Sequence, residues 1–190
     1  GQSIRVDPEV RVERLFRDAT AQGLHEVLCA NGLELMVSGA ESRQPAAEPG
    51  RVDCYLRPLE LPVPGLQKTQ LRLTCSLSLP RPGLAILKMH EFALLQYDET
   101  TGQMVFDETY STRGSIKAEM TNVLSFRQKG ADLSVVYQVK TSTVVPMPEW
   151  FAMSTDAINP FINSFITEAM KGGTEEMLDT VERGYRAGRV

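Results

Sequence analysis

Alternation of hydrophobic and polar residues is the main pattern in the middle of the chain. Leu71, Leu73, Cys75, Leu77 and Leu79 are separated by polar residues across positions 70–79. A period of two is typical of an antiparallel strand that has one buried face. The same reasoning predicts further strands at residues 52–59, 84–97, 103–112, 116–126 and 133–143.

The end of the chain, residues 146–190, has a different period. Its apolar residues recur three or four positions apart, which places them on one face of a helix. They are Ile158, Phe161, Ile162, Phe165, Ile166, Met170, Met177, Leu178, Val181 and Tyr185. Pro160 and the pair Gly172-Gly173 weaken a helix locally. We therefore predict one long helix with a soft point, or two nearly collinear helices.

The first fifty residues mix helical and extended signals. Residues 3–6 are predicted to form a short strand. The Asp-Pro-Glu sequence at residues 7–9 combines a capping side chain, a proline and an acid, which predicts a helix from there to about Cys29. Alternation predicts a strand at residues 33–37, and the prolines and glutamates of residues 41–50 predict a mobile surface loop.

These elements predict an α+β fold in which a curved antiparallel β-sheet wraps around a long C-terminal helix. A chain of 190 residues is large enough for one such domain, so we expect residues 1–190 to form a single domain. This arrangement can leave a cavity between sheet and helix. A lipocalin-like barrel is the alternative fold, and the early helix and the long closing helix count against it.

Composition and charge exclude several classes of function. The net charge is −4 and the basic residues are scattered, which argues against a nucleic-acid partner. The three cysteines form no CxxC pair, so neither a disulfide scaffold nor a zinc site is predicted, and no metal or cofactor is expected. No apolar run is long enough to span a bilayer. The GxSxG, phosphate-loop, GxGxxG and HExxH motifs are all absent from the sequence.

A candidate polar site follows from the predicted hairpin around residues 98–102. If this turn closes symmetrically, His90 lies opposite Tyr110 and Phe92 lies opposite Glu108, with Phe106 on the same face. A histidine beside a carboxylate and a phenol can transfer protons. The alternative is a cross-strand hydrogen-bonded group with no chemistry. A register slip of one residue would move His90 off this face.

A second set of candidates faces the expected cavity. Asn122 interrupts an otherwise apolar strand face close to Met120, and Tyr137 interrupts the face of the next strand. In a cavity these polar groups would orient a ligand, whereas in a filled core they would only be hydrogen-bonded. The helix would contribute Phe161, Phe165, Ile166 and Met170 to the same ligand site. Trp150 and Phe151 either contact a membrane surface transiently, or guard a pocket entrance, or pack beneath the helix start.

The order of elements resembles the helix-grip superfamily, which includes START-like lipid-transfer proteins, birch-pollen-allergen-like proteins and polyketide cyclases. Within it, the segments Tyr55-Leu56-Arg57-Pro58-Leu59 and Val145-Pro146-Met147-Pro148-Glu149 are similar to an uncharacterised plastid and cyanobacterial branch. That branch usually lacks the Gly172-Gly173 interruption. The resemblance implies a hydrophobic ligand, and it implies a soluble protein of the plastid, with any targeting peptide removed, or of the cytoplasm. The resemblance does not identify a catalytic residue in this sequence.

Three functions are consistent with the sequence. The first is the binding or transport of a lipid, pigment or similar apolar molecule, without catalysis. The second is a cyclase or dehydratase-like reaction that uses His90 with Glu108 or Tyr110. The third is a protein-interaction or assembly factor that has a filled core. The sequence does not predict an oligomeric state.

Overall fold

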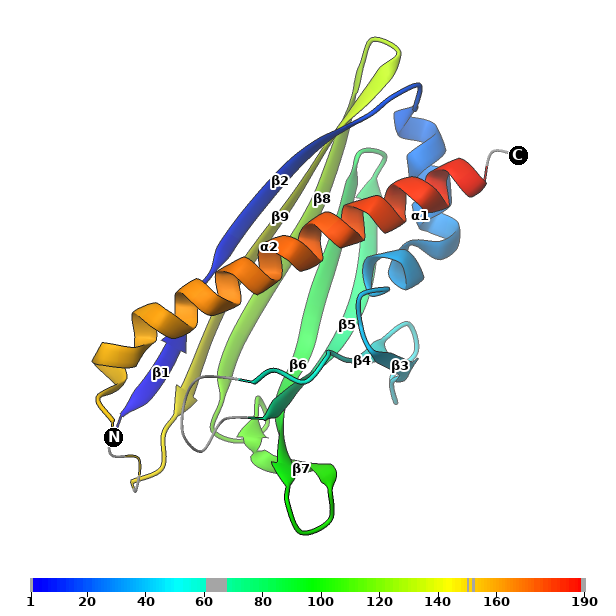
Figure 1. Cartoon of the computed structure of the whole chain (residues 1–190). Helices are drawn as coiled ribbons and strands as arrows, with labels where there is room; N and C mark the ends of the chain where they lie inside the picture. The colour runs from blue at the N-terminus through cyan, green and yellow to red at the C-terminus, as the bar shows by residue number, and fades with distance from the viewer. Residues whose placement is uncertain (1, 61–67, 150, 152, 189–190) are drawn as a thin grey trace.

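The computed structural model describes residues 2–60, 68–149, 151 and 153–188. Within them, nine strands form one antiparallel sheet, and two helices lie on one side of it (Figure 1). The elements are β1 (Ser3–Val6), β2 (Glu9–Phe16), α1 (Ala21–Met36), β3 (Ser42–Pro45), β4 (Val52–Tyr55), β5 (Thr69–Arg81), β6 (Leu84–Asp98), β7 (Gln103–Ser111), β8 (Lys117–Lys129), β9 (Asp132–Pro146) and α2 (Thr155–Ala187). The strand order is β1-β9-β8-β6-β5-β4-β3, with β2 also paired to β9 and β7 also paired to β6.

The strands predicted in the middle of the chain are confirmed as β5 to β9. The β8–β9 hairpin is the most regular pair, and it turns at Gly130, which adopts a φ of 64°. Its apolar positions face the helices: Leu124 pairs with Tyr137, and Phe126 pairs with Val135. All four side chains are buried, which agrees with the alternation of apolar and polar residues in the two strands. We call this helix-facing side the inner face of the sheet.

The predicted N-terminal helix is wrong, because residues 9–16 form strand β2. Val10 and Val12 pair with Val139 and Tyr137 of β9, and Phe16 is fully buried at the end of the strand. The Asp-Pro-Glu sequence instead forms part of the short connection between β1 and β2, which both pair with β9. Pairing with a strand more than a hundred residues away overrides the local capping signal.

Helix α1 begins and ends later than predicted. Thr20 caps its start by accepting a hydrogen bond from the backbone N–H of Gly23. The helix continues through a kink at Asn31 to Met36, so the predicted strand at residues 33–37 is wrong. Gly32 allows α1 to approach β5 closely, since a Cβ there would lie 2.5 Å from Cδ2 of Leu77. The predicted loop at residues 41–50 contains strand β3, which pairs with β4.

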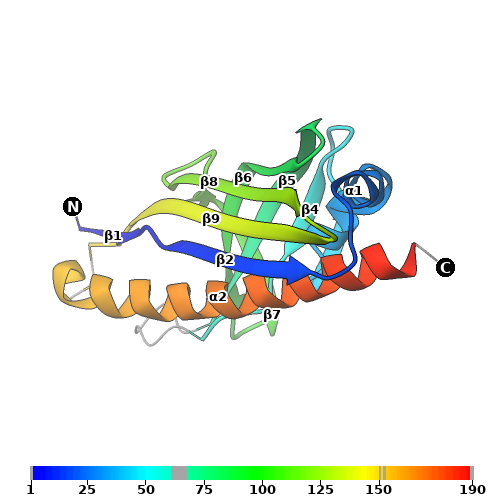
Figure 2. The ribbon, with the colours of Figure 1, turned by 90° about the horizontal axis from the view of Figure 1, so that it is seen from above.

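Helix α2 is one continuous helix that crosses the inner face of the sheet diagonally (Figures 1 and 2). Pro160 lies within it near its start, and Gly172 and Gly173 lie within its second half. Its buried residues cluster at its two ends. Between Ile162 and Thr174, residues 163–173 are all described and none is buried. The helix is therefore held at its ends and less tightly in its middle.

Three separate apolar clusters reflect this arrangement. The main core joins the sheet, α1 and the C-terminal half of α2. A second cluster joins β1 to the start of α2 through Ile4, Phe151, Ile158 and Ile162. A third lies beside the second, around Phe92, Leu94, Ile116 and Val145, since Val145 pairs with Ile4 and Met147 packs against both clusters.

Candidate functional site

A small polar group lies on the inner face where the three apolar clusters meet. The register of β8 and β9 pairs Met120 with Thr141, Asn122 with Val139 and Leu124 with Tyr137. Thr141 and Tyr137 are therefore the two diagonal neighbours of Asn122 on the same face of the sheet. Diagonal neighbours in an antiparallel pair are close enough for side chains of this size to interact.

The hydrogen-bonding capacity of this group is only partly used. Asn122 is 7% exposed, and its side chain forms a hydrogen bond with the hydroxyl group of Tyr137. Neither Oδ1 of Asn122 nor Oγ1 of Thr141 has a hydrogen-bond partner among the described residues, although both atoms are buried. Buried polar atoms in proteins are nearly always partnered. The two oxygens thus mark a place where a polar group of another molecule can bind.

The site carries no charge at neutral pH. Burial is the main cause that raises the pKa of Tyr137, and the hydrogen bond to Asn122 offsets it only in part. The pKa of Cys75, on β5, is raised by its hydrogen bond with Cys54 and by burial. Both groups therefore stay protonated. The chemistry of the site is that of neutral hydrogen-bonding groups in an apolar surrounding.

The surface around the polar group is apolar and half-buried. Thr141 and its partner Met120 are partly exposed, and so are Met89 on β6 and Leu73 on β5. Met89 lies one step beyond the last β6–β8 pair, Lys88 and Thr121, so Thr141, Met120 and Met89 form a row across three adjacent strands. Methionine side chains adapt readily to irregular partners. The row can therefore change shape around a ligand.

The predicted hairpin site does not form, because the register was wrong. Phe106 pairs with Leu95, and a register shift between Ala93 and Leu95 ends the regular pairing of β6 with β7. Neither Tyr110 nor Glu108 pairs with His90. The sequence could not reveal the irregularity, and a shift of one residue sends a side chain to the other face.

His90 instead belongs to the outer face of the sheet. It is the extra residue of a bulge between β5 and β6, since Thr74 pairs with Glu91 and Cys75 pairs with Met89. Nε2 of His90 lies 2.7 Å from the hydroxyl oxygen of Ser76. Burial, followed by the positive charge of Arg51, lowers the pKa of His90.

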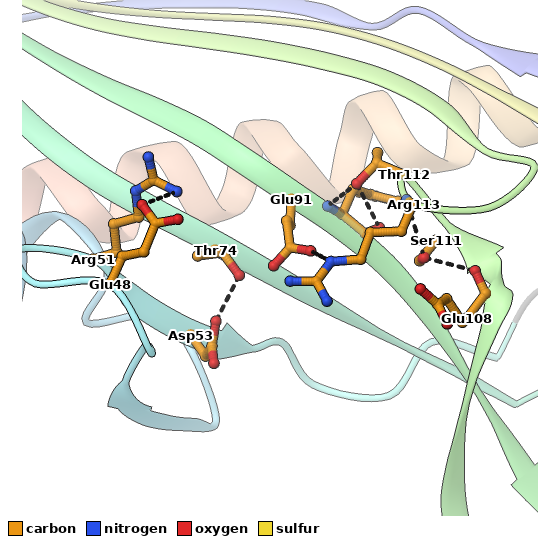
Figure 3. Close-up of polar contacts among 10 residues, drawn as sticks. Glu48, Arg51, Asp53, Thr74, Glu91, Glu108, Ser111, Thr112 and Arg113 are labelled. Atoms are coloured by element: carbon orange, nitrogen blue, oxygen red, sulfur yellow. Dashed lines mark hydrogen bonds and ion pairs between the residues drawn. The ribbon is translucent and has the colours of Figure 1, made fainter.

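Other polar pairs share this outer face, on the side of the sheet turned away from α2 (Figure 3). Thr74 donates a hydrogen bond of 2.6 Å to Asp53. Ion pairs join Arg113 to Glu91 and Arg51 to Glu48. Arg113 and Arg51 each pair with a carboxylate, and Asp53 accepts a hydrogen bond, which favours a structural role for the outer face.

The remaining hairpin candidates are dispersed. Glu108 is exposed, and its backbone carbonyl accepts a hydrogen bond from Ser111. Phe106 is exposed and lies under the guanidinium group of Arg72, with 4.7 Å between that group and the ring centre. Phe92 and Tyr110 belong to the third apolar cluster on the inner face. Of these residues, only Phe92 and Tyr110 can contact a ligand held there.

On α2, the predicted ligand-facing stripe is divided. Phe161 is 72% exposed and Phe165 is 40% exposed, so they point away from the sheet. Ile166 and Met170 are partly buried and pack against the second cluster and the main core respectively. Each helical residue turns by about 100°, so a stripe that includes every apolar residue is wider than the face that the sheet can cover.

The aromatic pair before α2 is described only in part. Phe151 is buried in the second cluster, which agrees with packing beneath the helix start. Trp150 lies outside the described residues.

Thr141 is the site residue that sequence reasoning missed. The apolar positions of its strand are Leu133, Val135 and Val139, with Tyr137 between them, and Thr141 is the next position of the same alternation. Extending the same alternation two residues further places Thr141 on that face. The signal that identifies Thr141 in the sequence is a polar residue at a position where the alternation places a buried side chain.

Three other features describe the surface and composition of the protein. The described residues include an open surface hollow of about 360 Å³ lined by Asp179, Glu182, Arg183 and Arg186, at the far end of α2 from the predicted ligand site. Within the part of the chain that the structure describes, no group of His, Cys, Asp and Glu side chains is arranged to hold a metal ion. Neither described helix is long and apolar enough to cross a membrane.

No family model and no curated protein matches the sequence. Solved structures match its fold over almost the whole chain. A putative uncharacterised protein from Rhizobium leguminosarum is 12% identical, with 98% of this chain and 99% of that chain covered and a TM-score of 0.53. The Zhui aromatase/cyclase from Streptomyces sp. R1128 is also 12% identical, with 97% of each chain covered and a TM-score of 0.52. A START superfamily protein from Mycobacterium smegmatis is 10% identical, with 93% and 94% covered and a TM-score of 0.48.

At these identities the likeness concerns the fold alone. The prediction of a large antiparallel sheet with a long C-terminal helix is confirmed, and this helix-grip fold is similar to those of the Rhizobium protein and the aromatase/cyclase.

Proposed function

We propose that this protein binds an apolar small molecule between the inner face of its sheet and the middle of α2. The observation that carries the proposal is the pair of buried oxygens without partners, on Asn122 and Thr141, in an otherwise apolar surface. Ligand sites typically combine apolar walls with a few placed polar groups. The helix-grip fold of the chain is consistent with such a site.

The packing of α2 supports the same location. Residues 163–173 bury no side chain, whereas both ends of the helix are anchored in apolar clusters. Burying apolar surface is worth roughly 25 cal/mol per Å². A ligand that packs against the half-buried side chains of Met120 and Met170 would gain this energy without displacing either anchor.

Native mass spectrometry of the purified protein, followed by organic extraction, tests the proposal directly. A co-purifying apolar molecule is the expected result. Met120→Trp should block binding, because a larger side chain would occupy the row on the inner face. The neighbouring Thr121→Trp is the matched control, since Thr121 is exposed on the outer face. An apo mass, together with no thermal shift across a panel of lipids and pigments, would refute the proposal.

A cyclase-like reaction is the second candidate, because a protein with a similar fold is an aromatase/cyclase. The specific version that uses His90 with Glu108 or Tyr110 is not supported, since β6 and β7 do not bring these residues together. Catalysis at the inner-face site would use the neutral groups Tyr137, Asn122 and Thr141. His90→Ala should therefore leave both binding and turnover unchanged.

The remaining expectations about partners and location stay predictions. The exposed side chain of Phe161 would be the contact point of an assembly factor or of a transient membrane contact. Membership of the plastid and cyanobacterial branch, and a plastid or cytoplasmic location, rest on the resemblance of the two short segments alone. Immunolocalisation in the source cell tests the location.

A further inference from the structure

We infer that the ligand is a neutral molecule with a hydroxyl group, which it presents to Asn122 and Thr141, and that it is not an anion such as a fatty acid or a phospholipid. This inference rests on the proposed function and defines the chemical class of its ligand. It follows from the hydrogen-bonding capacity and the charge of the site.

The hydrogen-bonding capacity favours a group that both donates and accepts. In the present orientation of Asn122, its amide group bonds to Tyr137 and Oδ1 is a free acceptor. If the amide were rotated, its N–H₂ would be the free group instead, since an amide has both donors and an acceptor. The hydroxyl group of Thr141 can take either role. A hydroxyl group on the ligand completes the hydrogen bonds in both cases.

The charge of the site disfavours an anion. The inner-face neighbours of Asn122 are Met120 and Leu124 on β8, Val139 on β9 and Leu87 on β6. None of them is charged. A carboxylate or phosphate buried here would have no cation beside it, and burying an unpaired charge is strongly unfavourable.

The helix contributes no cation either. From residue 157 to residue 167, α2 has no charged residue. In the middle of α2, the half-buried residues are Asn163, Ile166, Thr167 and Met170, and the first cation after them, Lys171, is exposed. A fatty-acid or phospholipid head would therefore have to stay outside the site.

The size of the effect follows from the number of hydrogen bonds. One hydrogen bond to a neutral partner changes an affinity by about threefold to tenfold. A hydroxyl ligand should therefore bind about threefold to tenfold more tightly than a matched ligand that can only accept. A matched carboxylate should bind more weakly than both, because it must be protonated or left unpaired.

The test is calorimetric titration of the full chain with 1-decanol, 1-methoxynonane and decanoate. Wild type is compared with Thr141→Val, which removes the hydroxyl group at nearly constant shape, and with Thr121→Val, a control on the exposed outer face of the same sheet. Thermal unfolding checks that each variant is folded. We expect decanol to bind most tightly, because it alone can donate to Oδ1 of Asn122. Thr141→Val should weaken decanol and the ether alike, since both accept a hydrogen bond from Thr141, whereas Thr121→Val should weaken neither.

The possible results separate the two proposals. Decanoate or the ether binding as tightly as decanol, or a decanol affinity that Thr141→Val leaves unchanged, would overturn the inference about the hydroxyl group and leave the proposed function standing. An unchanged affinity in Thr141→Val would mean that Thr141 does not contact the ligand. Absence of binding by all three compounds, together with an apo mass in native mass spectrometry, would overturn the proposed function itself.

Discussion

Replacing both Gly172 and Gly173 with alanine should stabilise the protein. Both glycines are exposed within α2, and a Cβ added at either position would have no heavy atom within 4 Å. An exposed glycine in a helix interior costs roughly 1 kcal/mol relative to alanine, because glycine loses more backbone freedom on folding. The double variant should therefore gain about 2 kcal/mol in the free energy of unfolding.

Urea denaturation followed by circular dichroism measures this gain. The midpoint should rise while the slope of the transition stays constant, since the surface exposed on unfolding does not change. For a chain of this size, about 2 kcal/mol corresponds to a rise in Tm of roughly 4–8 °C.

Gly184→Ala is the matched control in the same helix. A Cβ at position 184 would lie 2.8 Å from Cδ2 of Leu35, at the contact between α2 and α1. The gain in helix propensity should be offset by this clash, so the control should be less stable than the double variant. If Gly172→Ala/Gly173→Ala were neutral or destabilising with its helix content intact, the middle of α2 would have to pack against another part of the protein. The view of a helix held only at its ends would then be wrong.

Three further predictions concern burial and ionisation. Ile162→Ala should cost about 2–5 kcal/mol of unfolding free energy because Ile162 is 3% exposed, whereas Phe161→Ser should change it by less than about 0.5 kcal/mol; urea denaturation compares the two. Burial and Arg51 lower the pKa of His90 below its ordinary 6.5, so protonation is disfavoured in the folded state and the His90 contribution to stability should be lost as the pH falls below 6.5. Proton NMR titration should place the His90 midpoint below 6.5, and Arg51→Gln should raise it. A thiol reagent should modify Cys29 in the native protein and should reach the two buried cysteines only after unfolding, as mass spectrometry would show.

The sheet and the closing helix could be predicted because their patterns are regular. In β5, five apolar residues alternate without a break, and the two strands of the β8–β9 hairpin pair throughout their length. In such segments the alternation of apolar and polar residues shows which face of the strand is buried. The positions of Asn122 and Tyr137 on the buried face could be predicted for the same reason, since each interrupts an apolar face.

The errors occurred where a distant partner or an irregularity decides the structure. Residues 9–16 carry a good helix start, but pairing with β9 makes them a strand. Leu33 and Leu35 alternate like a strand, yet the kink at Asn31 lets α1 continue over them. The bulge at His90 moves that residue to the outer face. None of these effects leaves a local signal that a single sequence can show.

The pairing of β1 and β2 with β9 has a consequence for the order in which the protein can fold during its synthesis. Phe16 pairs with Leu133, so the N-terminal strands leave the ribosome 117 residues before their partner is made. At about 5–20 residues per second, this is a delay of roughly 6–23 s. Throughout that time Val10 and Phe16, both buried in the finished protein, have no strand to pair with. The nascent chain should therefore depend on chaperones that bind residues 3–16, and its yield should rise when translation through residues 17–132 is faster.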